Sequence, residues 1–215
     1  VRTFVVTPHR VTSGSMTPTL AVGDLVLADR FSYGIRMPLL DAPLAGDPVP
    51  QRGDVVVFTL PRPDGSDART FVKRVIGLPG ERIRLEGNRL AIDGAFVPTR
   101  PVDTDIDCLD PTQSRCRCDR QAERLGTHEV VTQHLSPPPA NTAIDCVNQE
   151  DWPLADEGTR TAPEVLVPDG HVLCLGDNRD NSSDGRSWGF LPLSHLRGRV
   201  LVRLWPPARG LGAIR

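Results

Sequence analysis

The apolar residues of this chain come in short segments of four to six residues, with glycine or proline in most of the gaps between them. Segments of this length that are rich in valine, leucine and isoleucine are typical of β-strands joined by turns. The 19 glycines and 21 prolines among 215 residues disfavour a helical bundle. The pattern therefore predicts a mostly β protein with antiparallel strands. The predicted strands are 3–6, 24–28, 54–59, 71–76, 82–85, 89–92, 171–175 and 199–204.

Two of the gaps have the length and composition of tight hairpin turns. Gly87-Asn88 separates two predicted strands, and Asp93-Gly94 follows the second of them. Both dipeptides suit two-residue turns, in which the backbone needs positive φ angles. We therefore expect consecutive hairpins around these two turns.

Residues 101–164 differ from the rest of the chain. They contain four of the five cysteines, the run Pro137-Pro-Pro139 and little apolar alternation. We predict an inserted, loop-rich subdomain that contains disulfide, with one short helix near residues 119–125. This insertion divides a core, an antiparallel β-barrel or sheet, into residues 1–100 and 165–215.

The cysteines indicate an oxidising compartment rather than a metal site. Cys116-Arg-Cys118 with His128 nearby lacks the ligand spacing of a zinc site. Cys108, Cys116, Cys118 and Cys146 allow three disulfide pairings, and the sequence does not choose among them. Cys174, alone in an apolar segment, is predicted to be a buried free thiol. No metal and no cofactor are predicted.

Charge and hydropathy exclude several classes of protein. A net charge of −2 with 39% hydrophobic residues is unlike a disordered tail or a nucleic-acid-binding protein. No apolar run approaches the roughly 18 residues that a membrane-spanning helix needs. The sequence begins at Val1 without a methionine, and we expect it to be the soluble portion of a longer protein.

One lysine, Lys73, stands against 24 arginines. A lysine amine can lose its proton inside a protein, whereas an arginine keeps its charge. Alternation on strand 71–76 places Lys73 on one face with Phe71 and Val75, where apolar neighbours disfavour the charged amine. Lys73 is thus a candidate general base. The alternatives are a chance survivor of an arginine-rich composition and an exposed lysine that extends along the surface.

Residues 13–20 form a small, polar segment after a predicted strand. Gly14 allows a sharp bend between Ser13 and Ser15, and Pro18 stiffens the residues around it. An accessible hydroxyl beside free N–H groups supplies a nucleophile and an oxyanion hole. The alternative is an ordinary serine- and glycine-rich loop.

Residues 175–190 are the most polar stretch of the predicted core. Asp180, Ser182, Asp184 and Gly185 have the offsets of a calcium-binding EF-hand loop, but its twelfth position is Leu191 instead of glutamate. The acidic residues and arginines are therefore expected to pair with one another, and the serines to orient another group. The five histidines fall in no triad-like pattern and are expected to be surface or satisfied residues.

Taken together, these segments resemble bacterial type I signal peptidases (leader peptidases), which are membrane-bound Ser/Lys endopeptidases. The resemblance covers the core on both sides of the insertion, and Glu123-Arg-Leu-Gly126 is similar to the larger insertion of Gram-negative members. The matching boxes are Ser-Gly-Ser-Met-x-Pro-Thr-Leu at 13–20, Gly23-Asp24, Arg-Gly-Asp-Val-Val-Val-Phe at 52–58, Lys-Arg-x-x-Gly-Leu-Pro-Gly at 73–80, Gly-Asp-Asn-Arg-Asp-Asn-Ser-x-Asp at 176–184, Arg186 and Trp-Gly-Phe at 188–190.

The resemblance implies a role for each matching residue. Ser15 corresponds to the nucleophile and Lys73 to the general base, in the Ser-Lys variant of acyl transfer. The backbone N–H of Ser15 and the hydroxyl of Ser13 correspond to the oxyanion hole, and Ser182 to the serine that orients the lysine amine. The supporting ion pairs are Asp184 with Arg186 and Asp177 with Arg74. The S1 and S3 pockets, which accept small side chains of an Ala-x-Ala site, correspond to Val11, Met16, Leu20, Phe71 and Val72.

Two departures from the family pattern, Thr12 and Gly185, affect loop stiffness but remove no catalytic atom. The resemblance implies a catalytic domain on the extracytoplasmic, periplasmic side of the bacterial inner membrane, with the membrane anchor missing from this chain. The implied partners are preprotein signal peptides and the membrane lipid surface, with no nucleic acid, and the expected state is a monomer. Residues 35–40 and Trp205 either contact the bilayer or pack in the ordinary way.

Two other functions stay open at this stage. One is a dedicated Ser/Lys maturation protease that serves a single exported substrate. The other is a catalytically silent module that binds signal peptides, although such a module has no need to retain Ser13, Ser15 and Lys73.

Overall fold

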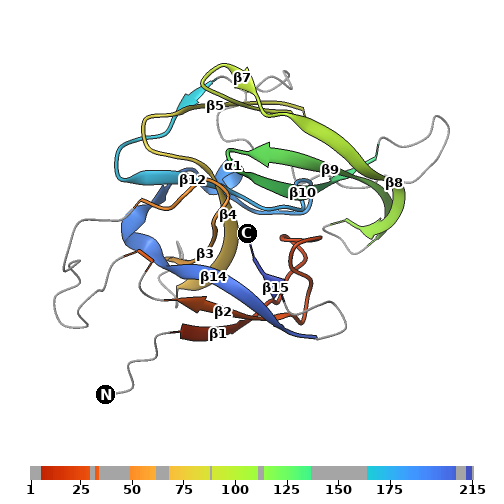
Figure 1. Ribbon diagram of the computed structural model, residues 1–215, viewed down its shortest axis with the longest axis horizontal. Helices are drawn as coiled ribbons and strands as arrows, with labels where there is room; N and C mark the ends of the chain where they lie inside the picture. Colours follow the sequence, from red (N-terminus) through yellow and green to blue (C-terminus); the bar gives the residue numbers. More distant parts are fainter. Residues whose placement is uncertain are drawn as a thin grey trace.

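The computed structural model consists of antiparallel β-sheets with one short α-helix among the described residues (Figure 1). The described residues are 6–29, 32–33, 49–61, 68–87, 89–110, 114–136, 164–206 and 212–214. The prediction of a mostly β protein with antiparallel strands is confirmed. The sequence left open whether the core is a barrel or a sheet. The structure contains sheets, and no strand pairing closes a barrel within the described part of the chain.

The largest sheet has eight strands and brings both halves of the chain together. Its order is β1 (Val6–Arg10), β2 (Leu25–Asp29), β14 (Leu196–Trp205), β3 (Val55–Leu60), β4 (Arg69–Gly77), β12 (His171–Leu175) and β13 (Leu191–Pro192), with β15 (Gly212–Ala213) beside β14. Two C-terminal strands therefore flank the β3–β4 hairpin. The predicted base, on β4, lies directly beside the strand that leads into the polar loop.

The second sheet contains the two predicted hairpins. Its order is β11 (Val165–Leu166), β5 (Arg82–Glu86), β6 (Arg89–Ile92) and β7 (Ala95–Phe96). Glu86 pairs with Arg89 and Ile92 with Ala95, so each turn has two residues, as predicted. Asp93 and Gly94 both have positive φ angles, 48° and 79°, which this type of turn requires.

Nearly all of the described part of the insertion, residues 101–110 and 114–136, belongs to a third sheet, and the loops and helix predicted for these residues were wrong. The strands β8 (Thr99–Leu109), β9 (Arg115–Leu125) and β10 (His128–Leu135) form a β10–β9–β8 sheet, so residues 99–135 are mostly strand rather than loop. The predicted helix at 119–125 is the end of β9. Polar and charged side chains hid the alternation, because cross-strand ion pairs such as Arg117 with Asp105 and Asp107 occupy the exposed face.

One disulfide joins two strands of this third sheet. Cys108 on β8 and Cys118 on β9 are bonded, with their Cα atoms 5.9 Å apart. Cys116 is disulfide-bonded as well, and Cys146 lies outside the described residues. Cys174 is free and fully buried, as predicted.

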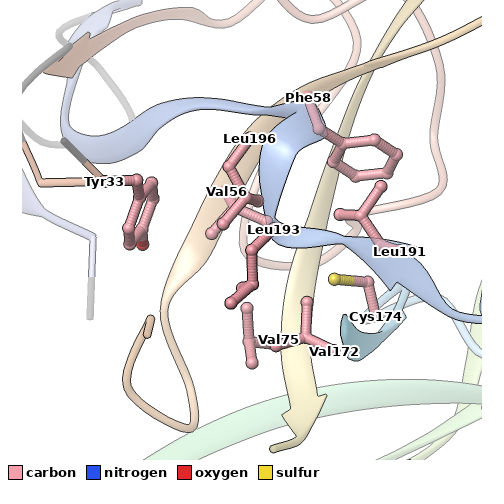
Figure 2. Packing of buried hydrophobic residues seen from close by; sticks show 9 residues of the cluster. All are labelled: Tyr33, Val56, Phe58, Val75, Val172, Cys174, Leu191, Leu193 and Leu196. Atoms are coloured by element: carbon pink, nitrogen blue, oxygen red, sulfur yellow. The ribbon is translucent and has the colours of Figure 1, made fainter. Parts of the chain in front are cut away.

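Two apolar clusters cover opposite faces of β3. Val56 and Phe58 face a cluster that also contains Val75, Val172, Cys174 and residues of the 191–196 segment (Figure 2). Val55 and Val57 face the cluster that contains Val11, Met16 and Leu20. Met16 and Leu20 thus hold the 13–20 segment against one face of the sheet that contains Lys73.

Residues 35–40 and Trp205 were expected either to contact the bilayer or to pack in the ordinary way. Residues 35–40 lie outside the described residues, and Trp205 is 57% exposed at the end of β14. Within the described residues, no helix has the length and apolar character required to cross a membrane.

The close packing of β14 on β2 generates a testable prediction. A Cβ atom at Gly198 would overlap the main-chain carbonyl group of Asp29. Because backbone rather than a mobile side chain must give way, Gly198→Ala is expected to lower the free energy of unfolding by at least about 2 kcal/mol. Chemical unfolding measures this change. Gly14→Ala, whose Cβ makes an ordinary 3.7 Å contact, is the control. An equal loss in both variants would contradict the packing argument.

Candidate active site

Lys73 is buried in the middle of the large sheet. Its side chain lies on β4, opposite Val56 of β3, and only 2% of the residue is exposed. The Nζ atom donates a hydrogen bond of 2.9 Å to the Oγ atom of Ser182. The hydroxyl of Ser182 thus orients the amine, as the resemblance implies.

Burial determines the protonation of Lys73. Removal from water lowers its pKa from 10.5 to about 8, Asp184 and Asp177 oppose this shift, and Arg186 adds to it. A lysine with this pKa is neutral in a substantial fraction of molecules near physiological pH. A neutral amine can accept a proton, so the environment makes Lys73 chemically able to act as a base.

The serine segment approaches the same loop from the other side. The Oγ atoms of Ser13 and Ser15 are 3.3 Å apart. The main-chain N–H of Asn178 donates to the carbonyl of Ser15 at 3.1 Å, and the Asn178 side chain donates to the carbonyl of Gly14 at 3.2 Å. Asn178 therefore joins the segment that carries Ser15 to the loop that carries Ser182.

Gly176 makes this approach possible. A Cβ atom there would overlap the Ser182 hydroxyl and the carbonyl oxygen of Ser15. Only glycine leaves room for both groups, so Lys73, Ser182 and the backbone of Ser15 lie in one neighbourhood. No hydrogen bond joins Ser15 Oγ to Lys73 Nζ, and catalytic hydrogen bonds of this kind are often loose without substrate.

The predicted ion pair between Arg74 and Asp177 is present and buried. The Arg74 guanidinium donates to both carboxylate oxygens of Asp177, at 2.8 and 2.7 Å. It also donates to the carbonyl of Gly53 at 2.7 Å and to the Thr19 hydroxyl at 3.3 Å. One side chain thus ties β4 to the polar loop, to the β3 turn and to the serine segment.

The second predicted ion pair, Asp184 with Arg186, lies beside the lysine. Two guanidinium nitrogens of Arg186 donate to Asp184 at 2.8 and 2.9 Å, and the N–H of Gly176 donates to it at 2.9 Å. Burial raises the pKa of Asp184, but Arg186 and, to a smaller extent, Lys73 lower it. Together they outweigh burial, so the net shift of this pKa is downward. Asp184 is therefore an anion that holds both Arg186 and the Gly176 backbone in place.

The residues predicted to line the substrate pockets do not all lie together. Val11, Met16 and Leu20 are buried in one cluster, and Val72 packs against it. Phe71 packs against the other cluster, where its ring stacks on Phe58 with centroids 5.7 Å apart. Four of the five residues thus belong to one cluster, which includes Met16 next to Ser15. Phe71 belongs to the other cluster, on the face of β4 that it shares with Lys73.

Sequence reasoning gave no site role to Gly176, Asn178, Glu123 or Arg179. Asn178 bonds the serine segment, and Arg179 forms a buried ion pair with Glu123 of the insertion. The only signal for Glu123 was its place in a motif shared with Gram-negative signal peptidases.

His134 is buried and only partly satisfied, since its Nδ1 atom has no hydrogen-bond partner. No group of three potential metal ligands occurs among the residues that the structure describes.

A family model and the sequences of known proteins identify one family. A family model described as "Signal peptidase, peptidase S26" matches residues 1–205. The signal peptidase I of Pseudomonas aeruginosa is 35% identical over 219 residues, which cover 96% of this chain and 68% of that protein. The signal peptidase I of Pseudomonas fluorescens is 34% identical over 222 residues, with the same coverage. A crystal structure of a signal peptidase I from Enterococcus faecalis is 24% identical, with a TM-score of 0.35, and covers 70% of this chain and 95% of that one.

The site geometry predicts a measurable titration. Lys73 is the only lysine, so labelling of lysine side chains with ¹³C or ¹⁵N gives a single side-chain NMR signal. We expect that signal to titrate with a midpoint near pH 8, because burial disfavours the ammonium form. A midpoint near the ordinary value of 10.5 would show that the amine is solvated, contrary to the structure.

Proposed function

Because this chain belongs to the signal peptidase family, peptidase S26, we propose that it removes N-terminal signal peptides from exported preproteins by cutting after an Ala-x-Ala-like site. In this proposal Ser15 is the nucleophile and Lys73 the general base. The observation that carries the assignment is the buried Lys73 amine, with its pKa lowered to about 8 and a hydrogen bond to Ser182.

The reaction proceeds in two steps that use the same amine. Neutral Lys73 accepts the proton of Ser15, whose Oγ attacks the carbonyl carbon of the scissile bond. The Ser13 hydroxyl and the Ser15 N–H stabilise the resulting oxyanion. Lys73 then returns the proton to the leaving amine, and the acyl group remains on Ser15. Finally, Lys73 removes a proton from water, which attacks the acyl-enzyme. Lys73 then gives this proton to the oxygen of Ser15 as the bond to the signal peptide breaks.

Selectivity for small residues follows from the apolar surroundings of the nucleophile. Val11, Met16, Leu20 and Val72 belong to one cluster, with Met16 next to Ser15, and the first three are at most 7% exposed. In this proposal these residues line the shallow apolar S1 and S3 pockets that the resemblance implies, which reject bulky side chains sterically. Alanine fits such a pocket.

The location and partners that we propose follow from the substrate. Signal peptides emerge at the inner membrane, so the catalytic domain acts on its extracytoplasmic side, as a monomer next to the lipid surface. Leu204 and Trp205 are exposed at the end of β14, where an apolar surface suits contact with a bilayer.

The proposal is tested with a synthetic preprotein peptide that carries one Ala-x-Ala site, incubated in detergent and analysed by mass spectrometry. The parent protein is expected to cut directly after the second alanine. Ser15→Ala and Lys73→Arg are expected to reduce kcat at least about 1,000-fold, because each removes a group that takes part in bond making or proton transfer.

Ser183→Ala is the matched control for these variants. Ser183 is exposed beside Ser182 and bonds only the hydroxyl of Ser187, so its removal is expected to leave cleavage unchanged. Cleavage by Lys73→Arg at the parent rate would refute the dyad. If the parent cuts no general signal peptide but cuts one exported precursor, it is a dedicated maturation protease. Binding of signal peptides without any cleavage would identify a silent binding module.

The pH dependence of cleavage is a separate prediction. Only neutral Lys73 accepts a proton, so kcat/KM is expected to rise with pH and to level off above the lysine pKa of about 8. Initial rates from pH 6 to 10 measure this profile. A rate that is already maximal at pH 6 would exclude Lys73 as the base.

A further inference from the structure

The insertion contacts the polar loop through backbone hydrogen bonds. The N–H of Gln133 on β10 donates to the carbonyl of Asp177, and the N–H of Arg179 donates to the carbonyl of Gln133, both at 2.8 Å. The N–H of Leu135 donates to the carboxylate of Asp180 at 2.7 Å. Residues 177–180, which precede Ser182, therefore run along the edge of the inserted sheet.

One buried ion pair crosses the same contact. Glu123 of β9 is 1% exposed and Arg179 is 3% exposed, and their charged groups are 2.6 Å apart. The hydroxyl of Thr132 donates to the other carboxylate oxygen of Glu123 at 3.1 Å. Loss of one partner from such a pair leaves a buried charge uncompensated, so the pair holds the loop strongly.

Arg179 continues this contact toward the catalytic lysine. Its main-chain carbonyl accepts a hydrogen bond from the guanidinium of Arg186. Arg186 pairs with Asp184, which is the anion that acts most strongly on the charge of Lys73. A continuous series of contacts thus leads from Glu123 in the insertion to Lys73 in the core.

The charges along this series balance in pairs. Glu123 with Arg179, Asp184 with Arg186 and Asp177 with Arg74 are three buried guanidinium–carboxylate pairs. The groups that act on Lys73 are Asp184, Arg186, Asp177 and Cys174. Arg179 and Thr132 contact Glu123, and His134 contacts Thr132. Burial lowers the pKa of His134 to about 3, with smaller contributions from Arg179 and Arg186, so His134 is neutral. Removal of the Glu123 charge leaves Arg179 as an excess buried cation.

A cavity of about 20 Å³ lies against Arg179, Arg186 and His134, and the Nε atom of Arg179 has no partner. This volume holds about one water molecule. Without Glu123, the guanidinium of Arg179 loses its carboxylate partner. The contact between the loop and β10 then consists of the backbone bonds of Gln133 and the bond from the Leu135 N–H to the Asp180 carboxylate.

We propose that Glu123 is a positioning residue: through Arg179 and Arg186 it holds the loop that presents Ser182 and Asp184 to Lys73. This inference rests on the proposed function, since Lys73 matters as the base of that reaction. It gives the insertion a role in catalysis, as a support for the catalytic loop.

The test uses Glu123→Gln, with Glu129→Gln as the matched control. Glu129 lies on β10 of the same sheet, but its pair with Arg100 is exposed. For Glu123→Gln we expect kcat for the Ala-x-Ala peptide to fall by about 100-fold, the loss typical of a small displacement of reacting groups, with KM unchanged. Glu129→Gln is expected to change neither quantity.

A second readout separates positioning from a merely structural role. The single lysine NMR signal of Glu123→Gln is expected to titrate at lower pH than that of the parent. The reason is that an excess cation and a displaced Asp184 both disfavour the ammonium form of Lys73. A folded Glu123→Gln protein with the parent's titration and kcat would overturn the proposal.

Two further outcomes are also decisive. If Glu123→Gln does not fold, Glu123→Asp replaces it, because aspartate keeps the charge but not the reach to Arg179. A kcat for Glu123→Asp equal to that of the parent would then overturn the positioning role, and a reduced kcat would support it. If the parent cuts no peptide, the proposed function fails, and the Lys73 titration alone decides whether Glu123 acts on the lysine.

Discussion

The burial of one amine is the constraint on which the rest of the site depends. A shift of the Lys73 pKa from 10.5 to about 8 corresponds to roughly 3 kcal/mol of disfavoured charge. The packing of β3, β4 and β12 imposes this desolvation, and the Ser182 hydroxyl limits it by accepting a hydrogen bond at 2.9 Å. Arginine at this position would remain charged, which explains why a chain with 24 arginines keeps lysine here.

The surrounding charges hold the loop in place without returning the pKa of the amine to its ordinary value. Asp177 and Asp184 lie near enough to Lys73 to favour its charged form, but each is paired with an arginine. Their pairing reduces that influence and leaves burial as the dominant effect. Asp184 also holds the N–H of Gly176, and Asn178, next to Asp177, donates to the carbonyls of Gly14 and Ser15. The loop that carries these charges therefore also positions the backbone of Ser15.

Sequence reasoning succeeded where a local pattern determines the structure. Apolar alternation located the core strands, and the dipeptides Gly87-Asn88 and Asp93-Gly94 located two hairpins. The lone lysine and the serine segment predicted a site, and the structure brings Lys73, Ser182 and the backbone of Ser15 together. The insertion was misread because its strands bury polar residues such as Glu123 and Thr132, whose burial depends on partners far away in the sequence. The contact between Glu123 and Arg179 spans 56 residues, and no local pattern indicates it.

The central claim is that Lys73 serves Ser15 as a base. A crystal structure with a peptide aldehyde that ends in Ala-x-Ala tests it most directly, because a serine nucleophile adds to an aldehyde to form a tetrahedral adduct. The account predicts a covalent bond from Ser15 Oγ to the aldehyde carbon, with Lys73 Nζ within about 3 Å of that oxygen. A bond to another residue, or an amine beyond hydrogen-bonding distance of Ser15, would contradict it.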